Sequence, residues 1–260
     1  MSEAAAGRDL VALPRAAVLM LWASAYLRGD LGPDDAAEMS HGVGRSGPSG
    51  EGEDLFTWMT ALRRLPLAQL RLVLPVPGRI AGLVGPPAAL PAALEAEQAI
   101  VVTAAGIADH TLIPVVSRID HPGGGVTAVG WDRFDAPLGT HVPPAATSGS
   151  AREELLRVLR RVADGSIDLD LVPDEPVEPA RIPPTWVSTA LPRHVDAAAA
   201  HLLVLAARTV ALTRSEIDEG HAQTIHLAEA LARRGLLDEL HDAARAALVE
   251  AVERIAAEPS

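Results

Sequence analysis

The chain has 260 residues and contains neither cysteine nor lysine. Without a thiol it has no cysteine nucleophile, no disulfide, no cysteine zinc site and no iron–sulfur cluster. Without lysine it has no amine for a Schiff base and no phosphate loop of the Walker type. We therefore expect no cofactor, and the lack of cysteine favours a reducing, cytoplasmic location.

Aromatic side chains and positive charge are also scarce. Aromatic residues make up 3% of the chain, so alanine, leucine and valine must fill most of the core. The net charge of -12 sets a repulsive average field against nucleic acid and against acidic membrane surfaces. We expect neither of them to be a partner of this acidic protein.

The most apolar run, residues 16–27, is shorter than the ~20 residues that a membrane-spanning helix needs. Arg8 and Arg15 precede the run and Ala23-Ser24-Ala25 resembles a cleavage site, so a signal peptide remains an alternative. Acidic residues nearby cancel those two charges, which weakens the alternative. We favour a core helix that ends near Gly29, because glycine commonly terminates helices.

Hydrophobic periodicity divides the rest of the chain into helices, then strands, then helices again. The expected helices are 16–28, 33–40, 54–65, a short one ending near 98, 150–165, 192–217, 222–234 and 236–256. The expected strands are 70–76, 100–104, 111–119 and 126–131, with Pro114 indicating an edge or a bulge. Loops or connectors are expected at 41–52, 121–125, 137–150 and 173–192, and a short edge strand at 167–171.

This order of elements predicts an α+β fold, with a small mixed β-sheet flanked by N-terminal helices and followed by a C-terminal helical bundle. Residues 1–147 would hold the helices and the mixed-sheet region. Residues 148–260 would form a helical region packed on it, and a single domain remains open as the alternative.

A glycine-rich loop after the first expected strand is the candidate ligand site. A strand that leads into a loop and a helix presents backbone N–H groups to an anion. Gly78, Gly82 and Gly85 would allow close approach, and the Arg79 guanidinium would bind phosphate or carboxylate. The spacing is not Gly-x-Gly-x-x-Gly, and two prolines after Gly85 lack N–H donors, so a purely structural loop is the competing interpretation.

Two histidine–carboxylate pairs offer a weaker hypothesis of a metal site. Asp218 and His221, and likewise Asp238 and His241, stand three residues apart on expected neighbouring helices. Such spacing places both side chains on one helical face. Solvated surface pairs explain the spacing equally well, and we assign no metal site.

Three segments carry a resemblance to known sequences, namely Leu74-Pro-Val-Pro-Gly78, Gly82-Leu-Val-Gly-Pro86 and Ala93-Leu-Glu-Ala96. Together with Leu13-Pro-Arg-Ala-Ala17 and the alanine- and arginine-rich C-terminal helices, they are similar to a family of uncharacterised conserved actinobacterial proteins. The resemblance implies an intracellular actinobacterial protein. It implies no activity and no site residues.

The absence of a recognisable catalytic set favours a non-enzymatic interaction or regulatory protein of the cytosol. The alternative is a protein or enzyme that binds a small anionic ligand at the loop of residues 78–85. We expect residues 201–212 to be almost fully buried except near Arg208, because that segment is apolar nearly all round. We also expect a homodimer through this segment or through residues 16–27, and a further protein partner is possible.

Overall fold

The protein forms two compact units in the computed structural model. The structure describes residues 10–41, 54–66, 68–80, 82–119, 126–137, 150–168, 181–219 and 227–258. The first unit comprises Met1–Ala145, Pro184–Asp196 and Val252–Ser260, and the second comprises Ala146–Pro183 and Ala197–Ala251. The chain therefore passes between the units more than once.

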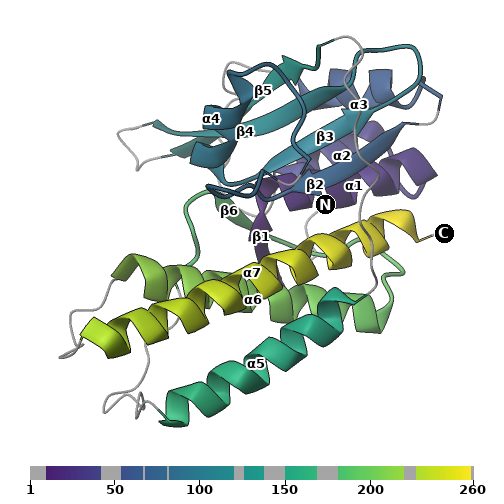
Figure 1. Cartoon of the computed structure of the whole chain (residues 1–260). Coiled ribbons are helices and arrows are strands. Elements are labelled where there is room, and N and C mark those ends of the chain that lie inside the picture. The colour runs from purple at the N-terminus through teal and green to yellow at the C-terminus, as the bar shows by residue number, and fades with distance from the viewer. Residues whose placement is uncertain are drawn as a thin grey trace. The chain divides into compact units, whose positions relative to one another are not determined.

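The helices and strands confirm the predicted α+β class (Figure 1). The first unit holds β1 Val11–Pro14, α1 Arg15–Arg28, α2 Pro33–Ser40, α3 Leu55–Leu62, β2 Gln69–Val73, α4 Ala89–Ala96, β3 Ala99–Thr103, β4 His110–Ile119, β5 Val126–Asp135 and β6 Trp186–Thr189. The second unit holds α5 Ala151–Asp168, α6 Ala197–Glu219 and most of α7 Leu227–Ala257. Along the chain, the helices α5, α6 and α7 come after the strands β2 to β5, as the sequence predicts.

A four-stranded sheet in the order β2-β3-β4-β5 forms the centre of the first unit. Every neighbouring pair is antiparallel, which corrects the expectation of a mixed sheet. The length of a connection permits either strand direction, and here Leu72 lies opposite Ile100 in antiparallel register.

Both faces of this sheet are covered. On one face a buried cluster is made by strand residues, α4 and the loop before it, namely Val73, Val84, Ala93, Ala99, Val101, Ile113 and Ala136. Alternate strand residues such as Leu72, Ile100 and Leu112 are buried as well, and α1 contacts β2, β3 and β4. The strands therefore separate two apolar layers, as period-two alternation requires.

The edge predicted at Pro114 is present in β4. Strand β3 pairs only with the first residues of β4, from His110 to Leu112. Pro114 lies beyond that pairing, opposite Trp131 of β5. A proline is tolerated there because it has no N–H to donate to a second neighbour.

Helix α1 is the most deeply buried helix of the first unit. Its side chains are buried from Arg15 to Tyr26, and it contacts α2, β1 and β6 in addition to the sheet. Gly29 ends the helix with φ 95, as predicted, because glycine adopts the left-handed conformation without a steric cost. The apolar run is thus a core helix of this unit.

Strands β1 and β6 pair as a separate antiparallel ribbon that sequence periodicity did not predict. Residues 173–192 were expected to be a connector, but they contain β6. The buried Gln98 side chain lies beside this ribbon, where it accepts a hydrogen bond from Ala16 N at 2.9 Å and donates one to Thr185 O at 3.2 Å. The Gln98 side-chain amide therefore provides a hydrogen-bond partner both for the N–H group at the start of α1 and for the carbonyl just before β6.

The second unit corrects two predicted helix ends. Gly165 and Gly235 were expected to stop helices, yet α5 continues to Asp168 and α7 runs unbroken through residue 235. Glycine within a helix costs only about 1 kcal/mol, which tertiary packing can outweigh. At Gly165 the reason is proximity, because a Cβ there would lie 3.1 Å from Leu236 Cδ1 of α7.

Several other expected features lie wholly or mainly outside the described residues. They are the loop at 41–52, the turn at 121–125, the linker at 137–150, and the part of the expected strand at 167–171 that follows α5. His221, which was considered as a partner of Asp218, also lies outside them.

Candidate functional site

The glycine loop begins with a tight turn. Val76 N donates to Arg79 O at 3.0 Å, and Arg79 N donates to Val76 O at 2.9 Å. Pro77 and Gly78 occupy the two central positions, where proline fixes the first φ and Gly78 supplies a φ of 83. The Arg79 side chain is exposed beside this turn.

Close contacts explain why the other two loop positions, Gly82 and Gly85, are glycine. A Cβ on Gly82 would lie 2.9 Å from Arg71 Nη2, and that nitrogen donates to Gly82 O at 2.7 Å. A Cβ on Gly85 would lie 2.9 Å from the Cβ of Ala89 at the start of α4. Both glycines also have positive φ. The sequence argument missed Arg71, although an arginine within an apolar strand is a visible signal.

Gly78, Gly82 and Gly85 thus have structural roles and the Arg79 backbone closes the turn, so several backbone groups of this loop are used internally. The N–H groups of Val76 and Arg79 are used within the turn, and Leu83 N donates to Ile80 O. Anion binding here stays a prediction.

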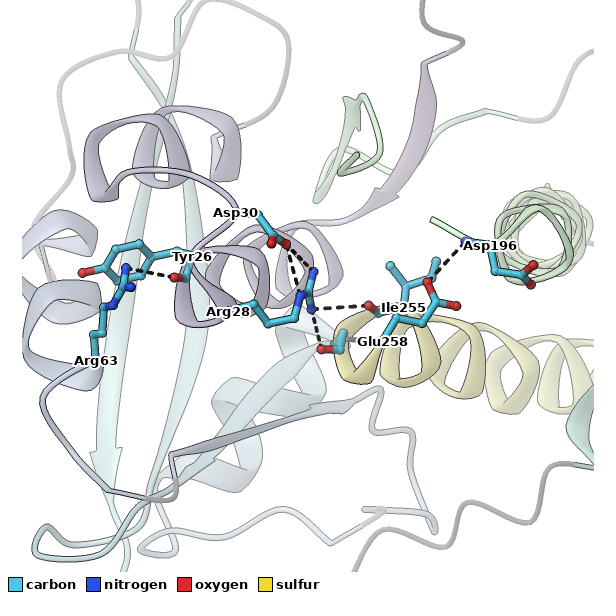
Figure 2. Close-up of polar contacts among 8 residues, drawn as sticks. Tyr26, Arg28, Asp30, Arg63, Asp196, Ile255 and Glu258 are labelled. Atoms are coloured by element: carbon cyan, nitrogen blue, oxygen red, sulfur yellow. Dashed lines mark hydrogen bonds and ion pairs between the residues drawn. The ribbon is translucent and has the colours of Figure 1, made fainter. Parts of the chain in front are cut away.

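A second polar site gathers around Arg28 at the end of α1 (Figure 2). Arg28 Nη1 donates to Ala256 O at 2.6 Å and to Ile255 O at 3.5 Å, so the guanidinium caps the last turn of α7. Its Nε also donates to Asp30 Oδ2 at 3.1 Å. A planar guanidinium suits this position because it binds carbonyls and a carboxylate at once.

Other helix ends in the first unit have long side chains as caps. Arg63 Nη1 donates to Tyr26 O near the end of α1 and stacks 4.8 Å from the Tyr26 ring centre (Figure 2). Arg15 Nη1 donates to His41 O at the end of α2, and burial lowers the pKa of this guanidinium. Glu258 accepts from Asp196 N at 3.2 Å, just before α6. The arginines thus stabilise the fold through helix C-termini.

A small cleft lies beside Arg28. It is lined by Arg28, Asp30, Arg193, His194, Val195, Ile255 and Glu258. Its internal space is about 20 Å³, which accommodates a water molecule but no substrate. His194 has a φ of 66, which is uncommon for a residue other than glycine. The mixed charges and the small volume indicate a structural polar contact.

One histidine is buried inside the first unit. His110 Nε2 accepts from Trp58 Nε1 at 3.3 Å, and its Nδ1 lies 3.2 Å from Ala108 O, to which it donates. Burial lowers the pKa of His110, so its neutral form is favoured in the folded protein. Both ring nitrogens have hydrogen-bond partners, so His110 serves as a structural residue of the core.

The proposed histidine–carboxylate pairs take other partners. Asp218 Oδ2 accepts from Arg214 Nε at 2.7 Å, and Asp238 Oδ1 accepts from Arg234 Nε at 3.0 Å. His241 Nδ1 lies 2.8 Å from Thr213 Oγ1. Within the part of the chain that the structure describes, no three metal-binding side chains come together.

Helix α6 presents an apolar surface that we call the α6 face. Its members share one arc of about 120° around the helix, at ~100° per residue. They are the exposed or half-buried residues Ala197, Ala198, His201, Val204, Leu205, Arg208, Leu212, Ser215 and Glu216. This corrects the expected near-complete burial of 201–212, because His201 is exposed and Leu212 is 40% exposed. The opposite side, including Leu203 and Ala206, is buried.

The segment Ala197–Asp218 is also, by length and composition, the one described helix apolar enough to cross a membrane. The core helix of a soluble protein meets the same criterion, and 50% of its most apolar window is buried. The apolar composition therefore distinguishes α6 from the other described helices, and it does not assign the helix to a membrane.

Comparison with known families identifies the first part of the chain. The model of the Rv1486c-like protein, N-terminal domain, matches residues 16–148. The chain belongs to the Rv1486c-like family. No curated protein and no solved structure matches it.

The Rv1486c-like match includes the glycine loop and the whole of α1 apart from Arg15. The α6 face lies after residue 148, outside the matched region. The family therefore supports the resemblance seen in the sequence, and the α6 face belongs to the part of this Rv1486c-like chain that no comparison describes.

Proposed function

We propose that this protein is a non-enzymatic interaction or regulatory protein, and that the α6 face is its contact surface. The observation that carries the proposal is the exposure of apolar side chains along one side of a long helix, with Leu212 at 40%. Contiguous apolar surface on a soluble protein marks interaction sites. Between Ala198 and Leu212 the face contains His201 and Arg208 but no carboxylate.

The polar sites support an interaction role for the α6 face, because their side chains already have partners within the fold. The Arg28 cluster is engaged with carbonyls and Asp30, and the cleft beside it is the size of a water molecule. His110 is satisfied in the core. The described polar clusters thus serve the fold, whereas the α6 face has apolar surface that a partner would cover.

We further propose a cytosolic protein of actinobacterial origin. Arginine in place of every lysine suits a high-GC genome, and the lack of cysteine suits a reducing compartment. Fractionation of the native host would test the location.

Site-specific photo-crosslinking in cells tests the contact surface. A photoreactive amino acid at Leu212 should give a discrete crosslinked product, whereas the same group at Leu231 should not. Leu231 is a matched control because it is 64% exposed and lies on α7. The absence of any product from position 212 would remove the support for an interaction role.

The alternative is binding of a small anion at the loop of residues 78–85. The exposed Arg79 beside the Gly78 turn favours it. A phosphate-dependent rise in melting temperature that disappears in Arg79→Ala, but persists in the exposed-arginine control Arg64→Ala, would establish this alternative. No shift with phosphate or nucleotides would exclude it.

A further inference from the structure

Only one of the two helices expected to form a homodimer has a free side. The α1 side chains from Arg15 to Tyr26 are buried within the first unit. They cannot contact another molecule unless that unit opens. Helix α6 retains an exposed arc, so a dimer built on either helix must use α6.

The apolar members of the α6 face form a line. Ala198, Leu205 and Leu212 recur at intervals of seven residues, which brings them to nearly the same side of a helix. His201, Arg208 and Ser215 follow three residues after each of them and form a second, polar line. Spacings of three and four residues are those of a packing seam between helices.

The apolar line is complementary to itself in the antiparallel direction. If a two-fold axis passes through Leu205, each Leu205 meets its copy, and each Leu212 meets Ala198 of the other molecule. The large, exposed Leu212 side chain then lies over a small one, which lets the helices approach closely. An isologous contact of this kind is the commonest way in which identical chains associate.

Charge agrees with this arrangement. In the antiparallel pair the two polar lines lie on the same side of the seam, where Arg208 is level with His201 of the other copy and about 9 Å along the axis from the other Arg208, at ~1.5 Å per residue. Between Ala198 and Leu212 the α6 face has no carboxylate, although the whole chain has a net charge of -12, and Glu216 beyond this segment pairs with Arg233 at 2.6 Å. It is therefore a surface on which two copies approach without repulsion between acidic groups.

We infer that the α6 face binds a second copy of this chain, as an antiparallel helix pair about a two-fold axis near Leu205. This deepens the proposed function and rests on the same surface. The segment from Ala198 to Leu212 is about 21 Å long at ~1.5 Å per residue, which is a small contact. We expect a reversible dimer with a dissociation constant in the micromolar range, since small interfaces are weak.

Sedimentation equilibrium between about 1 and 500 µM measures this association on the full chain. We expect the mass to rise from monomer to dimer across that range. Leu212→Arg should raise the dissociation constant at least tenfold, whereas Leu231→Arg should leave it unchanged. A monomer at every concentration overturns the inference, and so does a dimer that survives Leu212→Arg. Far-UV circular dichroism checks that both variants fold.

A single introduced cysteine provides an independent test, because the chain contains no cysteine of its own. Leu205→Cys should form an intermolecular disulfide under mild oxidation, since the two copies of this position meet at the axis. Ser215→Cys should not, because its copies would lie about 30 Å apart at ~1.5 Å per residue. Equal crosslinking of both variants overturns the register.

These results separate the dimer from the broader proposal. If the protein is monomeric but a crosslinker at Leu212 captures a different protein in cells, the dimer is wrong and the interaction role stands. If the chain is monomeric and position 212 captures nothing, both proposals fail.

Discussion

Helices α1 and α6 resemble each other in sequence and differ in surroundings. Both are rich in alanine and leucine, and neither has an acidic residue in its first turn. α1 is enclosed by the sheet, α2 and the β1-β6 ribbon, whereas α6 keeps an uncovered arc. An apolar sequence thus indicates how much surface a helix can bury. The neighbouring elements decide how much it does bury.

The two helices can be compared directly by truncating one leucine in each. Leu21 of α1 is fully buried, so Leu21→Ala should lower the free energy of unfolding by about 2–5 kcal/mol. Leu205 of α6 is only half-buried, so Leu205→Ala should cost less than about 2 kcal/mol.

Chemical denaturation of monomeric protein at low concentration measures both values. All four tryptophans lie in the first unit, at positions 22, 58, 131 and 186, so their fluorescence follows that unit. Circular dichroism follows the helices of both. Equal costs for the two substitutions would contradict the difference in burial.

Removing the two hydrogen bonds of the Gln98 side chain at the start of α1 should give the next largest loss of stability. Gln98→Ala removes the acceptor for Ala16 N and the donor to Thr185 O. We expect a loss of about 1–3 kcal/mol, because buried groups are left without partners. Tryptophan fluorescence in denaturant measures it. Gln69→Ala, at an exposed position of β2, is the control and should be nearly neutral.

Acid should destabilise the first unit through His110. Burial lowers the pKa of His110, so the unfolded chain binds a proton at a higher pH than the folded chain does. The stabilisation is complete above about pH 6.5, the usual histidine pKa, and is lost as the pH falls toward the lower folded pKa. His41, whose pKa burial and Arg15 also lower, contributes with the same sign.

Denaturation midpoints followed by tryptophan fluorescence from pH 8 to 5 should therefore fall. The fall should be shallower in His110→Gln. An unchanged slope in that variant would assign the pH dependence to other groups.

The smallest expected effects come from two helical glycines of the second unit. A Cβ at Gly235 would meet nothing within 4 Å, so Gly235→Ala should stabilise the protein by about 0.5–1 kcal/mol. At Gly165 the new methyl group would crowd Leu236, so Gly165→Ala should gain less than Gly235→Ala or destabilise the unit. Thermal unfolding followed by circular dichroism ranks them, and the reverse order would contradict the close approach at residue 165.

Periodicity predicted most elements because their patterns are local. The bounds of α2 at 33–40 are confirmed, and the helix expected at 54–65 is present as α3 at Leu55–Leu62. The β1-β6 ribbon was missed because each strand has only four residues and depends on a partner far along the chain. The helix through Gly235 was divided because propensity alone does not include tertiary packing.

For the α6 face, the sequence predicted the apolar character but not which side of the helix is exposed. The sequence identified 201–212 as apolar, but a segment apolar on all sides gives no sign of which side is covered. Arg71 and Arg28 were missed as structural ligands, because their carbonyl partners, Gly82 and Ala256, are set by the fold. An arginine within an apolar strand, such as Arg71, indicates that its side chain has a partner, but the sequence does not identify which backbone carbonyl that partner is.

The Glu258 cap has a practical consequence for handling the protein. Its carboxylate accepts from Asp196 N at 3.2 Å, directly after the last turn of α7. A label attached at residue 258 would lie beside this hydrogen bond and beside the contacts of Arg28 with the carbonyls of Ile255 and Ala256. Labels intended to leave these contacts intact belong away from the last turn of α7.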